Sequence, residues 1–204
     1  MKHKKPIIGI IGGIGAGKSR VAAEFERQGC LVVDSDRLNH EILRRPEVLA
    51  TLRDWWGEAV VAPDGGPDRR RIAKIVFADA GEKTRLESLV YPLIAQRRAA
   101  MIQAVEEESA VKAIVIDSPL LLESHLDREC DTIVFVNAGE SQRLTRLRRE
   151  RGWTAEEVRR REGWQLPLDE KRSRAAFVVE NDGPAEKLRP QVADILAAIL
   201  ARHS

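Results

Sequence analysis

The chain has 204 residues, of which 43% are hydrophobic and 32% are charged, and its 34 basic and 32 acidic residues leave a formal net charge of +2. This length suits one sizeable globular domain. The nearly balanced charge excludes a dedicated nucleic-acid binder, which carries an uncompensated basic face or tail. The sequence holds no uninterrupted apolar run of about 18 residues, so no membrane span is expected. Cys30 and Cys130 are far apart and lack metal-ligand spacing, which fits reduced thiols in a cytoplasmic protein.

The first predicted element is a short apolar strand over residues 7–11, and a glycine-rich loop follows it. Gly12-x-x-x-x-Gly17-Lys18-Ser19 matches the phosphate-binding pattern G-x-x-x-x-G-K-[ST]. Glycines allow such a loop to turn its backbone N–H groups toward phosphate oxygens, and the following helix directs its positive end at the same anion. We expect Lys18 to reach the β- and γ-phosphates and the Ser19 hydroxyl to bind Mg²⁺. The loop therefore predicts a nucleoside triphosphate site, with backbone contacts at Gly13, Gly15 and Gly17.

Four more apolar runs of strand length follow along the chain, at residues 30–33, 113–116, 132–136 and 177–179. Their continuous apolar character, without alternation, is typical of strands that are buried on both faces of a parallel sheet. Helical patterns fill the intervals, at residues 18–28, 36–53, 68–77, 83–106, 140–151, 155–162, 168–175 and 185–201. Strands that alternate with helices predict an α/β fold with a doubly wound, mainly parallel five-stranded sheet.

The uneven spacing of the strands predicts two helical insertions in one domain that spans residues 1–204. The core is assigned to residues 1–54, 111–139 and 176–204, with a helical region at about 55–110 and a very basic helical region at about 140–175. Thr154 and Glu157 form a capping-box pattern that starts the helix at 155–162. Pro190 is expected to kink or delay the last helix.

Two predicted strands end in carboxylates, at the edge where a doubly wound sheet binds its ligands. Asp34 and Asp36 follow the second strand, and Asp117 follows the third. Asp34 can accept a proton from an attacking hydroxyl group, as the catalytic carboxylate of kinases does. Asp117, after four apolar residues, resembles a Walker-B carboxylate that holds the Mg²⁺ shell. The alternative for each is that the carboxylate only caps the helix that follows.

The basic region carries a dense run of arginines that can act as a mobile lid. Guanidinium groups bind phosphate oxygens in a bidentate manner and can stabilise a phosphoryl group in transfer. The alternative is a solvated helix face whose arginines pair with nearby glutamates. The run consists of Arg143, Arg146, Arg148, Arg149 and Arg151.

Taken together, these stretches resemble the dephospho-coenzyme A kinase family, over nearly the whole chain. The loop "GGIGAGKS" and the segment "VVDSD" are similar to family motifs, as are "DRRRIAKIVFADAGEKTRLESLVYPLI", "PLLLE" and "QLPLDEKRSRAAFVVEN". The loop is shared by many nucleotide hydrolases and kinases, so the middle and late stretches are the discriminating ones. The family phosphorylates the ribose 3′-hydroxyl of dephospho-CoA with ATP in the last step of coenzyme A synthesis.

The resemblance implies a P-loop NTPase/kinase fold, with residues 55–110 as the acceptor region and residues 140–175 as the lid. Acceptor contacts are expected within residues 68–92 and 119–123. The implied catalytic residues are Lys18, Asp34, Arg146 and Arg149. The implied ATP-phosphate contacts are Gly15, Ala16, Gly17, Lys18, Ser19 and Arg20, while the local pattern alone assigns Ser19 and Asp117 to Mg²⁺.

Four positions depart from the family pattern. Ile11 and Arg20 stand where threonines are usual, Tyr91 replaces a histidine, and Ala176 replaces an aspartate. No role of the missing histidine or aspartate is therefore carried over to this chain.

These observations favour an ATP-dependent dephospho-CoA kinase that uses Mg²⁺. It is expected to be a cytoplasmic monomer or weak homo-oligomer, acting on a small molecule and not on nucleic acid or membrane. An alternative is a P-loop kinase for another small acceptor, such as a nucleoside or nucleotide. A GTP-binding switch protein is disfavoured, because the sequence has no Asn-Lys-x-Asp motif and no switch-like threonine segment.

Overall fold

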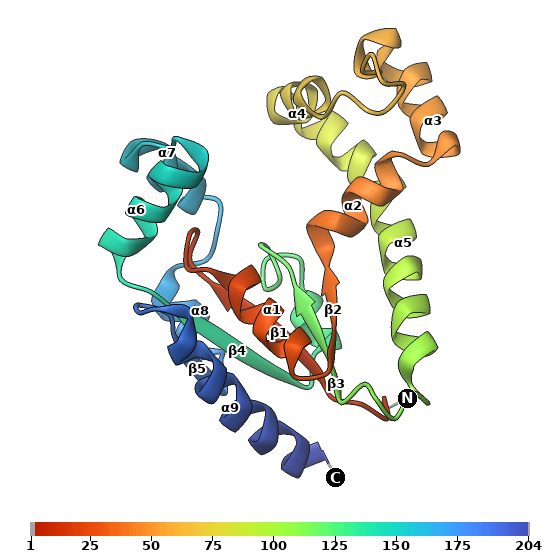
Figure 1. Cartoon of the computed structure of the whole chain (residues 1–204). Coiled ribbons are helices and arrows are strands. Elements are labelled where there is room, and N and C mark those ends of the chain that lie inside the picture. The colour runs from red at the N-terminus through yellow and green to blue at the C-terminus, as the bar shows by residue number, and fades with distance from the viewer. Residues whose placement is uncertain (1–2, 204) are drawn as a thin grey trace. The chain divides into compact units, whose positions relative to one another are not determined.

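A computed structural model describes residues 3–203, and within this range five strands form one entirely parallel sheet (Figure 1). The strand order is β2-β3-β1-β4-β5. All residues of the inner strands β1 and β3 are buried, which is the reason why their sequences are apolar up to Asp117 at the end of β3. The predicted fold is confirmed. The strands are β1 (Ile7–Gly12), β2 (Cys30–Asp34), β3 (Ala113–Asp117), β4 (Thr132–Asn137) and β5 (Phe177–Glu180).

Helices α1 (Lys18–Arg27) and α9 (Leu188–His203) pack against each other and against the sheet (Figure 1). Their apolar residues join those of the sheet in one buried cluster, in which Phe25, Val134 and Val192 are fully buried. This cluster fixes the start of α1 relative to the end of β1 and so positions the loop between them.

Three helices lie between β4 and β5, namely α6 (Glu140–Arg151), α7 (Ala155–Glu162) and α8 (Leu168–Ser173). The predicted capping box is present at the start of α7. The Glu157 backbone N–H donates to the Thr154 hydroxyl over 3.2 Å, and the Thr154 N–H donates to the Glu157 carboxylate over 2.9 Å. These reciprocal bonds satisfy two N–H groups that would otherwise lack partners, and thus fix where α7 begins. The short 3₁₀ helix η2 (Leu126–Glu129) lies between β3 and β4, and η3 (Ala185–Lys187) lies between β5 and α9.

The described chain divides into two compact units. The first contains the sheet and comprises residues up to 34 and from 104 onward, and the second comprises residues 35–103. The second unit has its own buried apolar cluster, which includes Ile42, Leu52 and Val90. It also contains residues 35–54, which the sequence analysis grouped with the core. Its elements are α2 (Ser35–Leu43), α3 (Pro46–Trp56), η1 (Glu58–Val60), α4 (Arg69–Ala78) and most of α5 (Ala80–Val105).

The prediction of one helix over residues 36–53 is wrong, because the chain leaves the helical conformation at Arg44 and Arg45. Arg45 is extended, with φ −64° and ψ 134°, and Pro46 occupies the first turn of α3. Proline disfavours a helical conformation in the residue before it and is well accommodated at the start of a helix. Pro190 likewise lies in the first turn of α9, which begins only after η3, so the expected delay is present. Among the described residues, no helix has the length and apolar character needed to cross a membrane.

Candidate active site

The glycine-rich loop joins the end of β1 to the start of α1 through left-handed backbone. Gly15 has φ 76° and Gly17 has φ 88°, a region that favours glycine. The loop is also closely packed: a Cβ atom at Gly15 would lie 2.8 Å from Leu147 Cγ of α6, and one at Gly17 would lie 2.3 Å from Asn181 Nδ2. Glycine is therefore required here both by conformation and by space.

The start of α1 provides a favourable environment for an anion. Gly17 is the N-cap and gives no side-chain cap, and the first turn contains no acidic residue. No side chain therefore caps the first N–H groups of the helix or neutralises its positive end, and both can act on a bound anion. Lys18 Nζ bends back over the loop and lies 3.3 Å from the Gly12 carbonyl oxygen and 3.2 Å from that of Gly13. Ser19 and Arg20, the next two predicted contacts, are exposed.

The structure brings the two predicted carboxylates together beside the loop. Asp34 of β2 lies directly opposite Asp117 of β3, and Asp117 lies opposite Ile10 of β1 on its other side. Residues opposite each other in a parallel pair point to the same face, and neighbouring strands are about 4.8 Å apart. Asp117 is 7% exposed. The exposed Asp36, by contrast, lies in the first turn of α2, the position of a helix-stabilising carboxylate.

The oxygen donors at this edge fit Mg²⁺, which prefers carboxylate, hydroxyl and phosphate oxygens. Between residues 3 and 203, no three His, Cys, Asp or Glu side chains form a cluster that could hold a metal ion. Mg²⁺ characteristically keeps only one or two protein carboxylates and takes its other ligands from substrate phosphates and water. The pairing of Asp117 with the Ser19 hydroxyl remains a prediction that agrees with this donor set.

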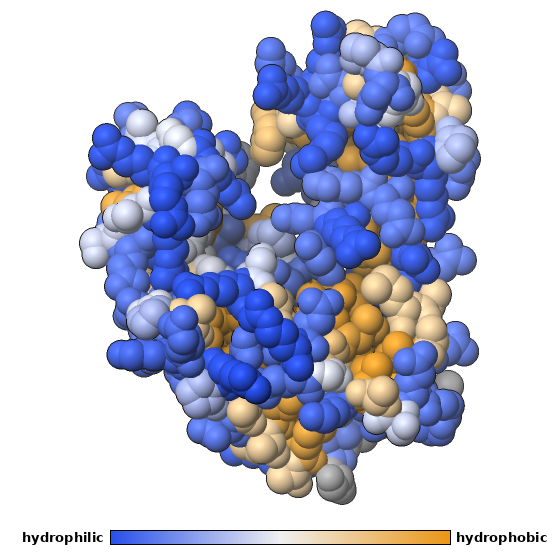
Figure 2. Space-filling view, in the orientation of Figure 1, coloured by the Kyte–Doolittle hydropathy of each residue, from blue (hydrophilic) through white to orange (hydrophobic). Residues whose placement is uncertain are grey.

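The arginines of α6 fall into two groups. Arg143 is buried, donates to the Ile14 carbonyl oxygen over 3.2 Å and forms an ion pair with Glu162 of α7. Arg146 donates to the Ala16 carbonyl oxygen over 3.1 Å. Arg149 is exposed and lies 3.0 Å from Glu150. The first two arginines thus hold the carbonyl side of the loop, whereas Arg149 points away from it into solvent as an exposed side chain. Figure 2 shows that the molecular surface is hydrophilic over much of this face.

A buried ion pair that the sequence analysis did not predict connects the segment after β3 to α8. Lys171 is 2% exposed, and its Nζ lies 2.9 Å from Glu123 Oε1 and 2.9 Å from Gln165 Oε1. The Leu166 N–H also donates to Glu123 Oε1, over 2.9 Å. Burial alone would raise the pKa of Glu123, but the hydrogen bonds from Lys171 and Leu166 outweigh it, so that the pKa lies below its usual value. The pair braces α8 beside the loop, since Leu168 of α8 would be 3.2 Å from a Cβ atom at Gly13.

Asn181 is a second residue that sequence reasoning missed. It directly follows β5, is 1% exposed, and its Nδ2 donates to the Ala16 carbonyl oxygen over 2.7 Å. One signal was available: a polar residue directly after a predicted strand of a parallel sheet lies at the same edge of the sheet as Asp34 and Asp117.

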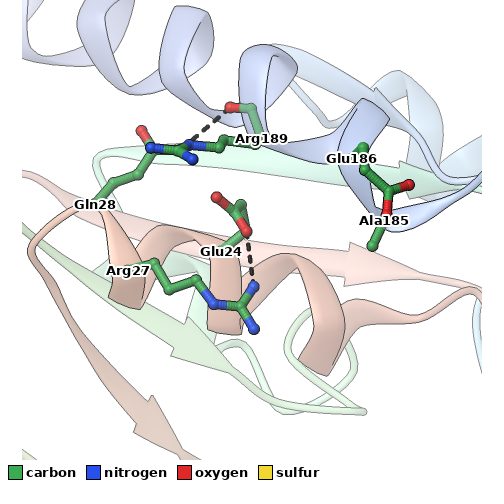
Figure 3. A pocket seen from close by; sticks show the side chains of 6 residues that line it. All are labelled: Glu24, Arg27, Gln28, Ala185, Glu186 and Arg189. Atoms are coloured by element: carbon green, nitrogen blue, oxygen red, sulfur yellow. Dashed lines mark hydrogen bonds and ion pairs between the residues drawn. The ribbon is translucent and has the colours of Figure 1, made fainter.

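A separate pocket of about 380 Å³ lies between α1 and the η3–α9 segment (Figure 3). None of the predicted site residues lines it. Two hydrogen bonds connect its lining residues: Arg27 donates to Glu24 over 2.8 Å, and the Gln28 amide donates to the Arg189 carbonyl oxygen over 3.2 Å. The pocket is therefore not assigned to the active site.

Comparison with known proteins agrees with this arrangement. The family model described as dephospho-CoA kinase matches residues 6–187. A protein named dephospho-CoA kinase from Corynebacterium glutamicum is 37% identical over 96% of this chain and 98% of its own length. A crystal structure of TT1252 from Thermus thermophilus has a TM-score of 0.80 and 36% identity, and covers 97% of this chain and 98% of that one. The dephospho-CoA kinase structure from Campylobacter jejuni shares the fold, with a TM-score of 0.71, 20% identity, and coverage of 98% of this chain and 100% of its own. This chain therefore belongs to the dephospho-CoA kinase family.

Proposed function

We propose that this protein transfers the γ-phosphoryl group of ATP to the ribose 3′-hydroxyl of dephospho-CoA, which yields CoA and ADP in the final step of coenzyme A biosynthesis. The observation that carries this proposal is the phosphate-binding loop with two carboxylates in register beside it, in a chain of this family. The loop alone supports any triphosphate reaction. The carboxylates add a base, which is the group that must take the proton when a hydroxyl group accepts the phosphoryl group.

ATP is bound by the loop N–H groups, the start of α1 and Lys18, with Gly13, Gly15, Ala16 and Gly17 as the backbone contacts and Arg20 at the edge. Ser19 and Asp117 are the residues that would hold Mg²⁺, which neutralises phosphate charge when it is bound. Because phosphoryl transfer depends mainly on positioning and charge stabilisation, these fixed donors provide most of the catalysis.

Asp34 is the proposed base. The 3′-oxygen of the acceptor forms a bond to the γ-phosphorus, the bond between that phosphorus and the β,γ-bridging oxygen breaks, and the hydroxyl proton passes to Asp34. The lid arginines stabilise the charge on the transferred group. Arg149 is exposed and can move to it. Arg146, placed on the loop carbonyls here, would have to exchange those bonds for phosphate, so Arg149 is the first candidate.

Measuring ADP release with a panel of acceptors tests the proposal and its alternative. We expect rapid ADP release with dephospho-CoA and at least tenfold slower release with nucleosides, nucleoside monophosphates and shikimate. Phosphorus NMR of the product should show a new 3′-phosphomonoester. Faster turnover of a nucleoside or nucleotide than of dephospho-CoA would establish the alternative kinase function instead.

We further place the enzyme in the cytoplasm, as a monomer or weak homo-oligomer that acts on a small molecule without nucleic acid. Cys30 is buried, and this burial raises its pKa to about 11, which keeps it a thiol at neutral pH. These features support a reducing compartment. Sedimentation velocity with and without ATP is the direct measurement of the oligomeric state, and a stable tetramer would contradict this assignment.

A further inference from the structure

The carbonyl side of the phosphate-binding loop is held by side chains from distant parts of the chain. A peptide group carries its C=O and its N–H on opposite sides, so a loop that points N–H groups at a ligand must point carbonyl oxygens away from it. Three consecutive carbonyl oxygens of the loop accept such bonds, from Arg143 at Ile14, from Arg146 at Gly15 and Ala16, and from Asn181 at Ala16.

Asn181 is fixed from several directions. Its backbone N–H donates to the Asn137 carbonyl oxygen over 2.8 Å, which continues the pairing of β5 with β4. Its own carbonyl oxygen accepts from Arg146 Nη2 at 2.5 Å. Its Nδ2 donates to the Ala16 carbonyl oxygen, and its Oδ1 is buried with no hydrogen-bond partner within the described residues. The amide is therefore oriented by its bond to the loop.

The same amide also meets the last glycine of the loop. A Cβ atom at Gly17 would lie 2.3 Å from Asn181 Nδ2, so the side chain packs directly on the Gly17 Cα. The peptide whose oxygen Asn181 holds is the one that joins Ala16 to Gly17, and it carries the Gly17 N–H at the N-cap of α1. When this oxygen is held outward, the Gly17 N–H is held inward, where the motif requires a donor to phosphate.

We propose that Asn181 is a positioning residue for ATP: it fixes the Ala16–Gly17 peptide in its phosphate-binding orientation, and Arg146 is the second donor to the same oxygen. This inference rests on the proposed function only to the extent that the loop binds ATP, and it does not depend on the acceptor. Preorganised donors of this kind lower the cost of ordering the loop when the ligand binds.

The test is equilibrium titration of the full chain with a non-hydrolysable ATP analogue and Mg²⁺, without any acceptor. Asn181→Asp keeps the shape of the side chain but places a carboxylate oxygen against the Ala16 carbonyl oxygen. We expect affinity for the analogue to fall roughly 10- to 100-fold, the usual range when a buried hydrogen bond is replaced by an unsatisfied group. In steady-state assays the KM for ATP should rise while the KM for the acceptor stays within about twofold, a split that a general loss of folding would not produce.

Asn137→Ala is the matched control, because Asn137 ends the neighbouring strand β4 and its amide donates to the exposed Glu180 over 2.7 Å and not to a loop carbonyl oxygen. It should leave the analogue affinity within about twofold of the original. If Asn181→Asp does not fold, Asn181→Ala removes the same donor without adding a charge and should weaken the analogue in the same direction. Analogue affinity within twofold of the original for a folded Asn181 variant would overturn the proposal.

A double-mutant cycle tests the shared oxygen. Because Asn181 and Arg146 both donate to the Ala16 carbonyl oxygen, each can partly compensate for the loss of the other. The combination of Asn181→Ala with Arg146→Gln should therefore weaken the analogue by more than the product of the two single effects. Effects that simply multiply would show that the two side chains act independently, which would overturn the assignment of Arg146 as the second donor. ADP release with dephospho-CoA is measured in a separate assay. If dephospho-CoA proves not to be the acceptor, that assay shows it, while the analogue affinities of the single and double variants still test the role of Asn181.

Discussion

At the scale of single residues, Lys18 provides the most direct test of the phosphate site. Its Nζ lies over the Gly12 and Gly13 carbonyl oxygens, at the mouth of the loop, where ATP phosphates would replace those contacts. We expect Lys18→Ala to lower turnover by on the order of 10²–10³, the effect of losing one preorganised donor to the transition state. The exposed Lys112, changed to Ala, is the control and should leave turnover unchanged. Near-normal ADP release by Lys18→Ala would remove this residue from the mechanism.

Asp34 should affect chemistry more than nucleotide binding. Asp34→Asn keeps the shape of the side chain but removes its charge and basicity, so turnover with dephospho-CoA should fall roughly 10²- to 10⁴-fold, as for loss of a general base. Affinity for a non-hydrolysable ATP analogue should change only a few-fold, because the loop and α1 hold the phosphates. The exposed Asp36, two residues away in α2, provides the matched variant Asp36→Asn. Equal losses of turnover in the two variants would show that Asp34 has no special catalytic role.

At the scale of elements, the sequence predicted the strands correctly, because continuous runs of apolar residues determine where they lie. The five strands lie within about one residue of their expected places, because uninterrupted apolar runs suit a parallel sheet buried on both faces. The break between α2 and α3 was missed because the apolar spacing of Leu38 and Ile42 continues through Val48 and Leu52 across Pro46. In this segment the apolar residues keep a helical spacing on both sides of Pro46, but the proline alone was enough to end the first helix.

The site could be predicted only in part, for a similar reason. The loop and the placement of Asp34 and Asp117 at one edge follow from motif and strand ends. The bond from Asn181 to Ala16 and the pair of Glu123 with Lys171 connect residues that are far apart in sequence. Such contacts depend on strand order and on the path of α6 to α8, which no local period encodes.

The buried pair of Glu123 and Lys171 predicts a stability that depends on pH. Because the pKa of Glu123 is lowered in the folded state, its contribution is fully present above the ordinary pKa of a glutamate and is lost as the pH falls through the lower folded value. Glu123→Gln leaves Lys171 buried without its counter-charge, and we expect the free energy of unfolding at pH 7 to fall by about 3 kcal/mol. The difference between the original chain and the variant should shrink toward pH 3.

Urea unfolding at pH 7 and in steps down to pH 3 measures this difference, provided that the unfolding remains reversible. Glu170→Gln is the control, since Glu170 pairs with Arg174 at the surface, where ion pairs contribute about 0–1 kcal/mol. A difference between the original chain and Glu123→Gln that stays constant over the whole pH range would contradict the role of the Glu123 charge.

At the scale of the whole molecule, each of the two compact units has its own apolar core. Leu52 is fully buried in the apolar cluster of the second unit. Leu196 of α9 is 3% exposed in the apolar cluster that the sheet forms with α1 and α9 in the first unit. Separate cores allow each unit to open without the other, because local unfolding follows the contacts that hold a cooperative segment together.

We therefore expect Leu52→Ala to speed amide hydrogen exchange within residues 35–103 while the strands β1, β3 and β4 keep their protection. Leu196→Ala should do the reverse. Each change removes a buried side chain at a cost of roughly 2–5 kcal/mol, so the two variants are matched in chemistry and differ only in the core they disturb. Mass-spectrometric exchange under native conditions resolves the two regions. Equal acceleration in both regions by either variant would show that the chain opens as one cooperative body, and the two cores would then have to be treated as one in every stability argument.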